Sequence, residues 1–164
     1  MQQTEFMIEE DSHKMVVTRA FKAPLEMVWQ AWTDSAILDA WWAPKPWKAA
    51  TKTQNFAPGG TWLYAMTGPG GEKHWSLTTY VAIEPMESFT ADGCFCDENA
   101  NVNPDFPNSS QWHVVFTPQD GATLVTITMT FDTAEALNKM MAMGFKEGFT
   151  MAHGNLDAWI LEQM

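Results

Sequence analysis

Hydrophobic and polar residues alternate through most of the middle of the chain, which is the pattern of strands in an antiparallel sheet. Between residues 48 and 131, apolar side chains recur at every second position in several short segments. Clusters such as Pro58-Gly59-Gly60 and Asp120-Gly121 separate these segments and indicate turns. We therefore predict a meander of six antiparallel strands over this region, preceded by one strand over residues 14–21.

Two regions outside the meander have the three- and four-residue spacing of helices. The first follows Pro24 and is interrupted around Asp34, so we predict two short helices there. The second runs from Asp132 to Met164, and Asp132 with Glu135 resembles a capping box at its start. We predict one long C-terminal helix over this stretch.

The predicted C-terminal helix contains Gly144, Gly148 and Gly154 in its interior. Each glycine costs about 1 kcal/mol relative to alanine at such a position. Two reasons could compensate for this cost: close approach of the helix to a sheet, or space left for a ligand. The sequence leaves both open.

These elements predict an α+β protein in which a curved antiparallel sheet of about seven strands wraps around a long C-terminal helix. This arrangement buries the apolar faces of both the sheet and the helix. The length of 164 residues fits one domain. We expect that domain over residues 14–164, after an N-terminal tail over residues 1–13, and we expect a loop from Asp97 to Ser110.

Composition and charge exclude several functions. The chain is 46% hydrophobic, with 9 Trp, 10 Phe and 12 Met, which is typical of a folded protein. Its net charge of -11 argues against binding to nucleic acid or to an anionic membrane surface. There is neither a membrane-spanning run nor a secretion signal, so we expect an acidic, cytoplasmic protein.

Chemistry-bearing residues are sparse in the sequence. Cys94 and Cys96 fall on the same face of a predicted strand and read as reduced thiols, and we expect no metal or cofactor. No catalytic motif is present, so the sequence does not decide whether the protein is an enzyme. Alternation places His74 and His113 opposite Trp75 and Trp112, which predicts that both histidines face solvent.

Four segments resemble a known family: FKAPLEMVWQAWTD, LDAWWAP, FAPGGTWLYAM and MGFKEGFTMAHGNLDAWI. They are similar to the activator of heat-shock-protein-90 ATPase homologue family, which belongs to the START-like superfamily, and the resemblance covers residues 14–162. It implies the helix-grip fold, with a cavity between sheet and C-terminal helix that takes apolar small molecules. Asn55-Phe56-Ala57 departs from the family, which often has an acidic and a basic residue there.

We therefore expect a small-molecule binding protein whose apolar cavity takes an aromatic or lipid-like ligand. One alternative is a cyclase, aromatase or hydrolase, in which Tyr64 or His153 would position a proton on a bound carbonyl compound. Another is a chaperone ATPase activator, and the sequence also leaves a homodimer open. The expected ligand-binding residues are the large apolar and polar-tipped side chains on the predicted cavity faces: Trp42, Trp62, Tyr64, Trp75, Trp112, Met141, Phe145, Phe149 and His153.

Overall fold

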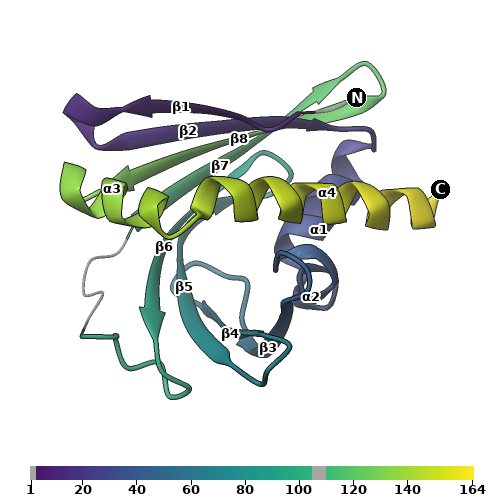
Figure 1. Cartoon of the computed structure of the whole chain (residues 1–164). Coiled ribbons are helices and arrows are strands. Elements are labelled where there is room, and N and C mark those ends of the chain that lie inside the picture. The colour runs from purple at the N-terminus through teal and green to yellow at the C-terminus, as the bar shows by residue number, and fades with distance from the viewer. Residues whose placement is uncertain (1–2, 105–109) are drawn as a thin grey trace.

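A single curved antiparallel sheet with helices on its concave side forms the protein (Figure 1). The computed structural model describes residues 3–104 and 110–164. The strands are β1 (Glu5–Glu9), β2 (Lys14–Phe21), β3 (Lys48–Gln54), β4 (Thr61–Thr67), β5 (Lys73–Glu84), β6 (Ser88–Cys96), β7 (Ser110–Gln119) and β8 (Ala122–Phe131). The helices are a short 3-10 turn (Glu10–Ser12), α1 (Leu25–Thr33), α2 (Ser35–Trp41), α3 (Ala134–Ala142) and α4 (Phe145–Gln163).

The strands are ordered β1-β2-β8-β7-β6-β5-β4-β3 in the sheet. The predicted α+β class and the predicted first strand over residues 14–21 are confirmed. The count of about seven strands is too low, because residues 5–9 of the expected tail form β1 and pair with β2. This edge strand gave a weak pattern because its side chains are little buried, Met7 being 64% exposed.

The two short helices after β2 form as predicted, and Asp34 separates them. Its carboxylate accepts a hydrogen bond from the Ala36 N–H at 2.9 Å and so caps α2. The indole Nε1 of Trp41 donates to the carbonyl oxygen of Ala31 at 3.0 Å, which ties α2 to α1. The two helices therefore form one packed unit.

The predicted long C-terminal helix is present as α4, but its predicted extent from Asp132 is wrong, because the stretch is divided into α3 and α4 at Gly144. Gly144 has φ of +84°, in the left-handed region that glycine adopts without a steric penalty. The predicted capping box is also wrong: Thr133, not Asp132, is the N-cap of α3, and its hydroxyl accepts from the Ala136 N–H at 3.0 Å. The break separates α3 from α4, which follow one another across the sheet (Figure 1).

The other two glycines of this region lie inside α4 without close neighbours. A Cβ built on Gly148 would meet Pro44 at 3.6 Å, which is an ordinary contact. A Cβ built on Gly154 would have no described atom within 4 Å outside its own stretch of helix, and Gly154 is exposed. Close packing against the sheet therefore explains neither glycine.

The predicted loop from Asp97 to Ser110 is described only in part. Val102 forms an isolated bridge with Cys96, and the Asn103 N–H donates to the Phe95 carbonyl at 2.9 Å. The Lys52 ammonium donates to the carbonyl oxygen of Glu98 at 2.8 Å, which links this segment to β3. Residues 105–109 of the prediction lie outside the described residues.

Candidate ligand-binding site

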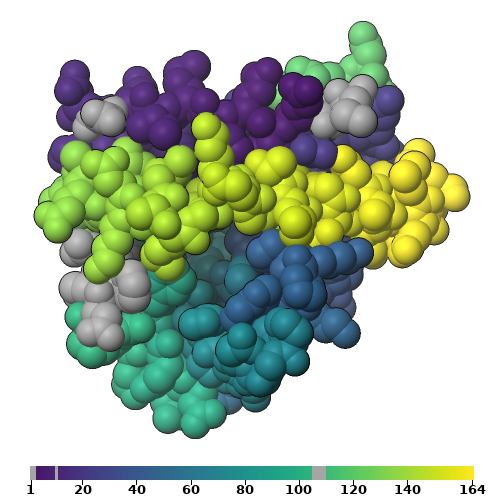
Figure 2. Space-filling view, viewed as in Figure 1, coloured from purple at the N-terminus to yellow at the C-terminus, as the bar shows by residue number. Residues whose placement is uncertain are grey.

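A pocket of about 830 Å³ lies between the β4–β7 part of the concave face and the helices. Residues of β4, β5 and β6 form one wall, while α3 and the first turns of α4 form the other. The end of α2 and the connection to β3 close one side through Trp42, Pro44 and Trp47. In the space-filling view the surface is hollowed below the α3–α4 junction, between this junction and α2 (Figure 2).

Aromatic rings line the pocket from both the sheet and the helices. Trp62 and Tyr64 are stacked, with ring centroids 4.1 Å apart and an angle of 23° between the planes. From the helix side, Phe145 and Phe149 stack at 5.0 Å, and Phe149 meets Trp112 edge-on at 5.7 Å. Rings held by one another in this way keep their orientation, so they present fixed flat surfaces to the pocket.

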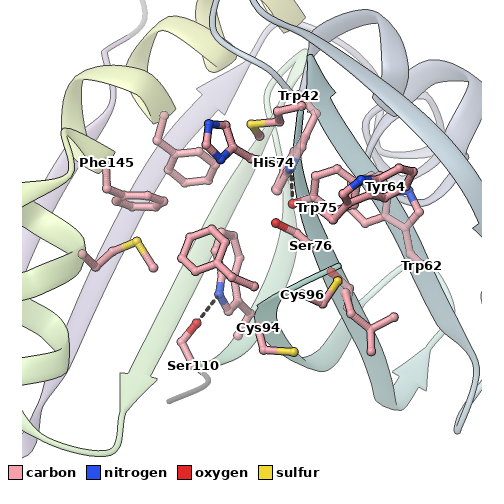
Figure 3. A pocket seen from close by; sticks show the side chains of 18 of the residues that line it. Trp42, Trp62, Tyr64, His74, Trp75, Ser76, Cys94, Cys96, Ser110 and Phe145 are labelled. Carbon is pink, nitrogen blue, oxygen red and sulfur yellow. Dashed lines mark hydrogen bonds between the residues drawn. The ribbon is translucent and has the colours of Figure 1, made fainter. Parts of the chain in front are cut away.

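Tyr64 is the central polar group of the pocket. Its hydroxyl oxygen accepts a hydrogen bond from the Trp42 Nε1–H at 2.9 Å (Figure 3). Burial raises the pKa of Tyr64 above its ordinary value, although hydrogen bonds from Trp42 and Ser76 partly offset this. The phenol is therefore neutral near pH 7, and because its oxygen accepts from Trp42 its own O–H can donate a hydrogen bond.

The strand register decides which side chains of β5 share the face of Tyr64. Tyr64 pairs with Ser76, and Met66 pairs with His74, so Ser76 and His74 lie on the concave face. Trp75 pairs with Ala65 and with Cys96 and so belongs to the other face, although it also borders the pocket. The prediction therefore exchanged the two faces of β5. His74 lines the pocket at an exposed position, and its ring centroid lies 5.3 Å from that of Trp47.

The strand register puts Trp75, Cys94 and Cys96 on the face opposite to Tyr64, although all three also border the pocket. Cys94 and Cys96 are free thiols, and burial raises the pKa of Cys96 to about 11. The Lys52 ammonium lies 5.9 Å from the centroid of the Trp75 ring. A thiol with a raised pKa is protonated near neutral pH and is a poor nucleophile or metal ligand.

His153 does not line the pocket and is fully buried. Its Nδ1 shares a hydrogen bond with the Thr4 hydroxyl at 2.9 Å, and the Phe149 ring lies 4.2 Å from the imidazole. Burial, with a smaller contribution from the Arg19 charge, lowers the pKa of His153 to about 3. His153, one of the predicted ligand-binding residues, therefore lies outside the pocket lining, and Phe149, one turn earlier on α4, lines the pocket.

A buried ionic network surrounds His153. Arg19 is 6% exposed, and its guanidinium donates to the Asp157 carboxylate and, at 2.8 Å, to the Thr4 hydroxyl. His153 Nε2 and Arg19 Nε are buried without a hydrogen-bond partner among the described residues. This network joins the residue before β1 to β2 and α4, in a part of the fold that lies away from the pocket.

Most of the predicted site residues meet in the pocket: Trp42, Trp62, Tyr64, Trp75, Trp112, Phe145 and Phe149 are on its border. Met141 does not line the pocket. Met140, in α3, and Met143, directly after α3, line it instead. Sequence reasoning missed Trp47, His74 and Ser76. The sequence shows the hydrophobic periodicity of helices and strands, but it does not show the register of each strand against its neighbour, which decides the side chains that share a face.

The remaining chemistry of the site is limited. No group of three metal-ligating side chains occurs among residues 3–104 and 110–164. None of the helices that the structure describes is both long and apolar enough to cross a membrane. The pocket thus offers apolar contact area, the two buried phenols of Tyr64 and Tyr80, and hydroxyl and imidazole groups nearer the rim.

Comparison with known proteins identifies the family of the chain. Residues 22–160 match the family described as Activator of Hsp90 ATPase homolog 1-like protein. The chain belongs to this family. A comparison with curated proteins finds no match.

Several solved structures have the same fold as this protein. The crystal structure of a protein from Mycobacterium smegmatis is 31% identical, with a TM-score of 0.90 and 99% of each chain covered. The solution structure of a protein from Arthrobacter aurescens is 30% identical, with a TM-score of 0.89, and covers 96% of this chain and 91% of that one. At 21% identity, a Rhodobacter sphaeroides protein shares the fold with a TM-score of 0.81 and 99% of each chain covered. The START-like helix-grip fold is thereby confirmed.

Proposed function

We propose that this protein binds an apolar, flat small molecule in the pocket between β4–β7 and the α3–α4 junction. The observation that carries the proposal is the pocket itself, which has a volume of about 830 Å³ and a mainly apolar lining with many aromatic side chains. Voids in a packed protein interior are normally little larger than a water molecule. A space of about 300–1,000 Å³ with an apolar lining is typical of a small-molecule site.

The polar group of the pocket narrows the ligand further. Tyr64 is 7% exposed, it lines the pocket, and its O–H is available to donate to a ligand beside the Trp62–Tyr64 stack. An oxygen acceptor on the ligand, such as a carbonyl or ether oxygen, would satisfy this donor. The proposed ligand therefore combines aromatic or polycyclic rings with an oxygen acceptor near its centre.

An enzymatic role on such a ligand is the second candidate, and Tyr64 is the observation that favours it. A neutral phenol in an apolar pocket suits donation of a hydrogen bond to a reacting carbonyl oxygen. His153 cannot share this role, since its pKa of about 3 keeps it neutral and Thr4 occupies its Nδ1. Binding is the function that the geometry supports best, because the lining of the pocket offers mainly apolar contact area.

Native mass spectrometry of the purified protein, with solvent extraction, tests whether a small molecule co-purifies. Titration with the neutral dye N-phenyl-1-naphthylamine tests the same site directly, and we expect saturable binding with transfer of energy from tryptophan. Gly93 lies on the concave face beside Trp112, and a Cβ there would meet only Trp112 Nε1, at 3.9 Å, among the described atoms outside its immediate neighbours. Gly93→Val should keep the fold and weaken dye binding at least about tenfold, by filling the pocket.

Tyr64→Phe separates the role of the hydroxyl from that of the ring. The variant should weaken displacement of the dye by the ketone 2-acetylnaphthalene by about threefold to tenfold, while the dye itself binds as before. Equal dye affinity in Gly93→Val and the unchanged protein would show that the pocket is not the binding site.

A further inference from the structure

Two hydroxyl groups of the pocket lining are each held by the indole of a tryptophan (Figure 3). The Trp42 Nε1–H donates to the Tyr64 hydroxyl at 2.9 Å, and the Trp112 Nε1–H donates to the Ser110 hydroxyl at 3.0 Å. Tyr64 belongs to β4, whereas Ser110 is the first residue of β7. The same pairing therefore occurs at two separate places in the pocket.

The indole partner leaves the Ser110 hydroxyl as a hydrogen-bond donor. An indole N–H can only donate, so the Ser110 oxygen accepts from Trp112 and its own O–H is left to donate elsewhere. Among the described residues, the side chain of Ser110 has no hydrogen bond besides this one. Ser110 is 7% exposed, as Tyr64 is, so a ligand that displaces water from the pocket must supply an acceptor or leave a buried donor unpaired.

The other buried phenol of the pocket lies elsewhere. The Tyr80 hydroxyl accepts from Gln54 Nε2 at 3.2 Å, and the same Nε2 donates to the carbonyl oxygen of Thr33 at 2.8 Å. Tyr80 therefore belongs to the side of the pocket where β3 meets α1. Ser76 is hydrogen-bonded to Tyr64 itself and belongs to the Tyr64 side.

The sheet is flat beside Ser110. Gly93 pairs with Ser110 on β7 and with Thr78 on β5. A Cβ built on Gly93 would meet Trp112 Nε1, at 3.9 Å, as its one described contact within 4 Å outside its immediate neighbours. No side chain rises from the sheet at this position, so a flat ring has room to lie on β6.

Trp42 and Trp112 connect the two hydroxyls. Their ring centroids are 6.0 Å apart, so one aromatic wall runs from Tyr64 to Ser110. Because β5 and β6 lie between β4 and β7, the backbones at the two places are about 14 Å apart along a flat sheet, and less on a curved one. A hydrogen bond of about 2.8 Å at each hydroxyl leaves a span that suits a small fused ring system.

We propose that the ligand carries two oxygen acceptors separated by a flat ring system, and that Tyr64 and Ser110 each donate a hydrogen bond to one of them. This inference rests on the proposed function and names the class of ligand, an aromatic compound with two carbonyl or ether oxygens. Ser110 then becomes a ligand-binding residue. A hydrocarbon, or a ring system with a single oxygen, would leave the Ser110 donor unpaired.

Two ketones of nearly the same shape test the second acceptor. 2,6-Diacetylnaphthalene has two carbonyl groups, and 2-acetyl-6-isopropylnaphthalene replaces one of them with an apolar group of similar size. Displacement of N-phenyl-1-naphthylamine measures the affinity of each. Ser110→Ala should weaken binding of the diketone by about threefold to tenfold and leave binding of the isopropyl compound nearly unchanged.

A second serine provides the matched control. Ser88→Ala makes the same change on β6 outside this pocket, and it should alter the binding of neither ketone. Tyr64→Phe should weaken binding of the diketone about as much as Ser110→Ala does. If one diketone molecule contacts both hydroxyls at once, the two substitutions together should weaken its binding by the product of the single effects.

The outcomes separate this inference from the proposed function. If N-phenyl-1-naphthylamine does not bind, the proposed function fails. If the dye binds but the diketone does not displace it, or binds Ser110→Ala and the unchanged protein equally, the proposed function stands and the second acceptor is overturned. Equal weakening of both ketones by Ser110→Ala would also overturn it, because this would show a change in the shape of the pocket instead of a lost hydrogen bond.

Discussion

The two halves of the concave face are made of similar residues but are packed differently. Where β2 and β8 meet α4, side chains such as Met15, Met129 and Leu156 are completely buried. Where β4–β6 face the α3–α4 junction, equally large residues such as Met66 and Met140 are only half-buried and border a pocket. Figure 1 shows the cause: the β3–β6 end of the sheet curves away beneath the helices.

The comparison teaches that hydrophobic composition does not decide whether a face is filled. On the filled half, α4 brings large side chains, among them Leu156 and Ile160, onto β2 and β8. On the open half, the helix contributes Gly148, which has no side chain to place in the pocket. The pocket is left open because the β3–β6 end of the sheet lies away from the helices and because Gly148 faces it without a side chain.

The largest expected effect is on stability, from removing matched methionines of the two halves. Met129→Ala should cost about 2–5 kcal/mol in free energy of unfolding, because it leaves a cavity in a filled core. Met140→Ala should cost less than about 1 kcal/mol, because the side chain already borders a pocket. Urea denaturation measures both, and similar losses would contradict the distinction between the halves.

The buried histidine of the filled half predicts a pH dependence of stability. The folded protein holds His153 neutral down to about pH 3, whereas the unfolded chain binds a proton near pH 6.5. The unfolded state therefore binds more protons below pH 6.5, and stability should fall there by up to about 1.4 kcal/mol per pH unit.

Denaturation between pH 7 and pH 5 would measure this slope. His153→Gln should flatten the slope, whatever it does to the stability at pH 7. His113→Gln, which changes an exposed histidine, should keep it. A slope that is unchanged in His153→Gln would show that other groups are responsible.

The glycines of α4 should respond in opposite directions to alanine. Gly144→Ala should destabilise the protein by about 1–2 kcal/mol, because φ of +84° is unfavourable for a residue with a Cβ. Gly154→Ala should stabilise it by up to about 1 kcal/mol, because an exposed helical glycine is replaced by a better helix former. Thermal denaturation measures the change in stability of each variant. Destabilisation by Gly154→Ala would contradict the open surroundings of this glycine.

The fold could be predicted because its signals are local. Alternation gave the strands, Asp34 gave the break between α1 and α2, and the family motifs gave the helix-grip arrangement. The division of the C-terminal helix was missed, because a glycine within a helical pattern is also compatible with a continuous helix. The strand β1 was missed because an exposed edge strand needs little hydrophobic alternation.

The site was predictable in its residue types but not in its geometry. Tyr64 and the Phe145–Phe149 pair were identified because large residues recur at core spacing. The faces of Trp75 and His74 were exchanged, since the pairing of Tyr64 with Ser76 is a long-range property that no short pattern contains. His153 was misplaced because its burial depends on Thr4 and Arg19, far away in the sequence.

The open half is the central claim, and filling it from the helix side tests it most directly. Titration of N-phenyl-1-naphthylamine should be compared between Gly148→Leu, which projects into the pocket, and Gly154→Leu, an equal change at an exposed position of the same helix. The account predicts that Gly148→Leu loses dye binding while Gly154→Leu retains it. Undiminished binding in Gly148→Leu would contradict it.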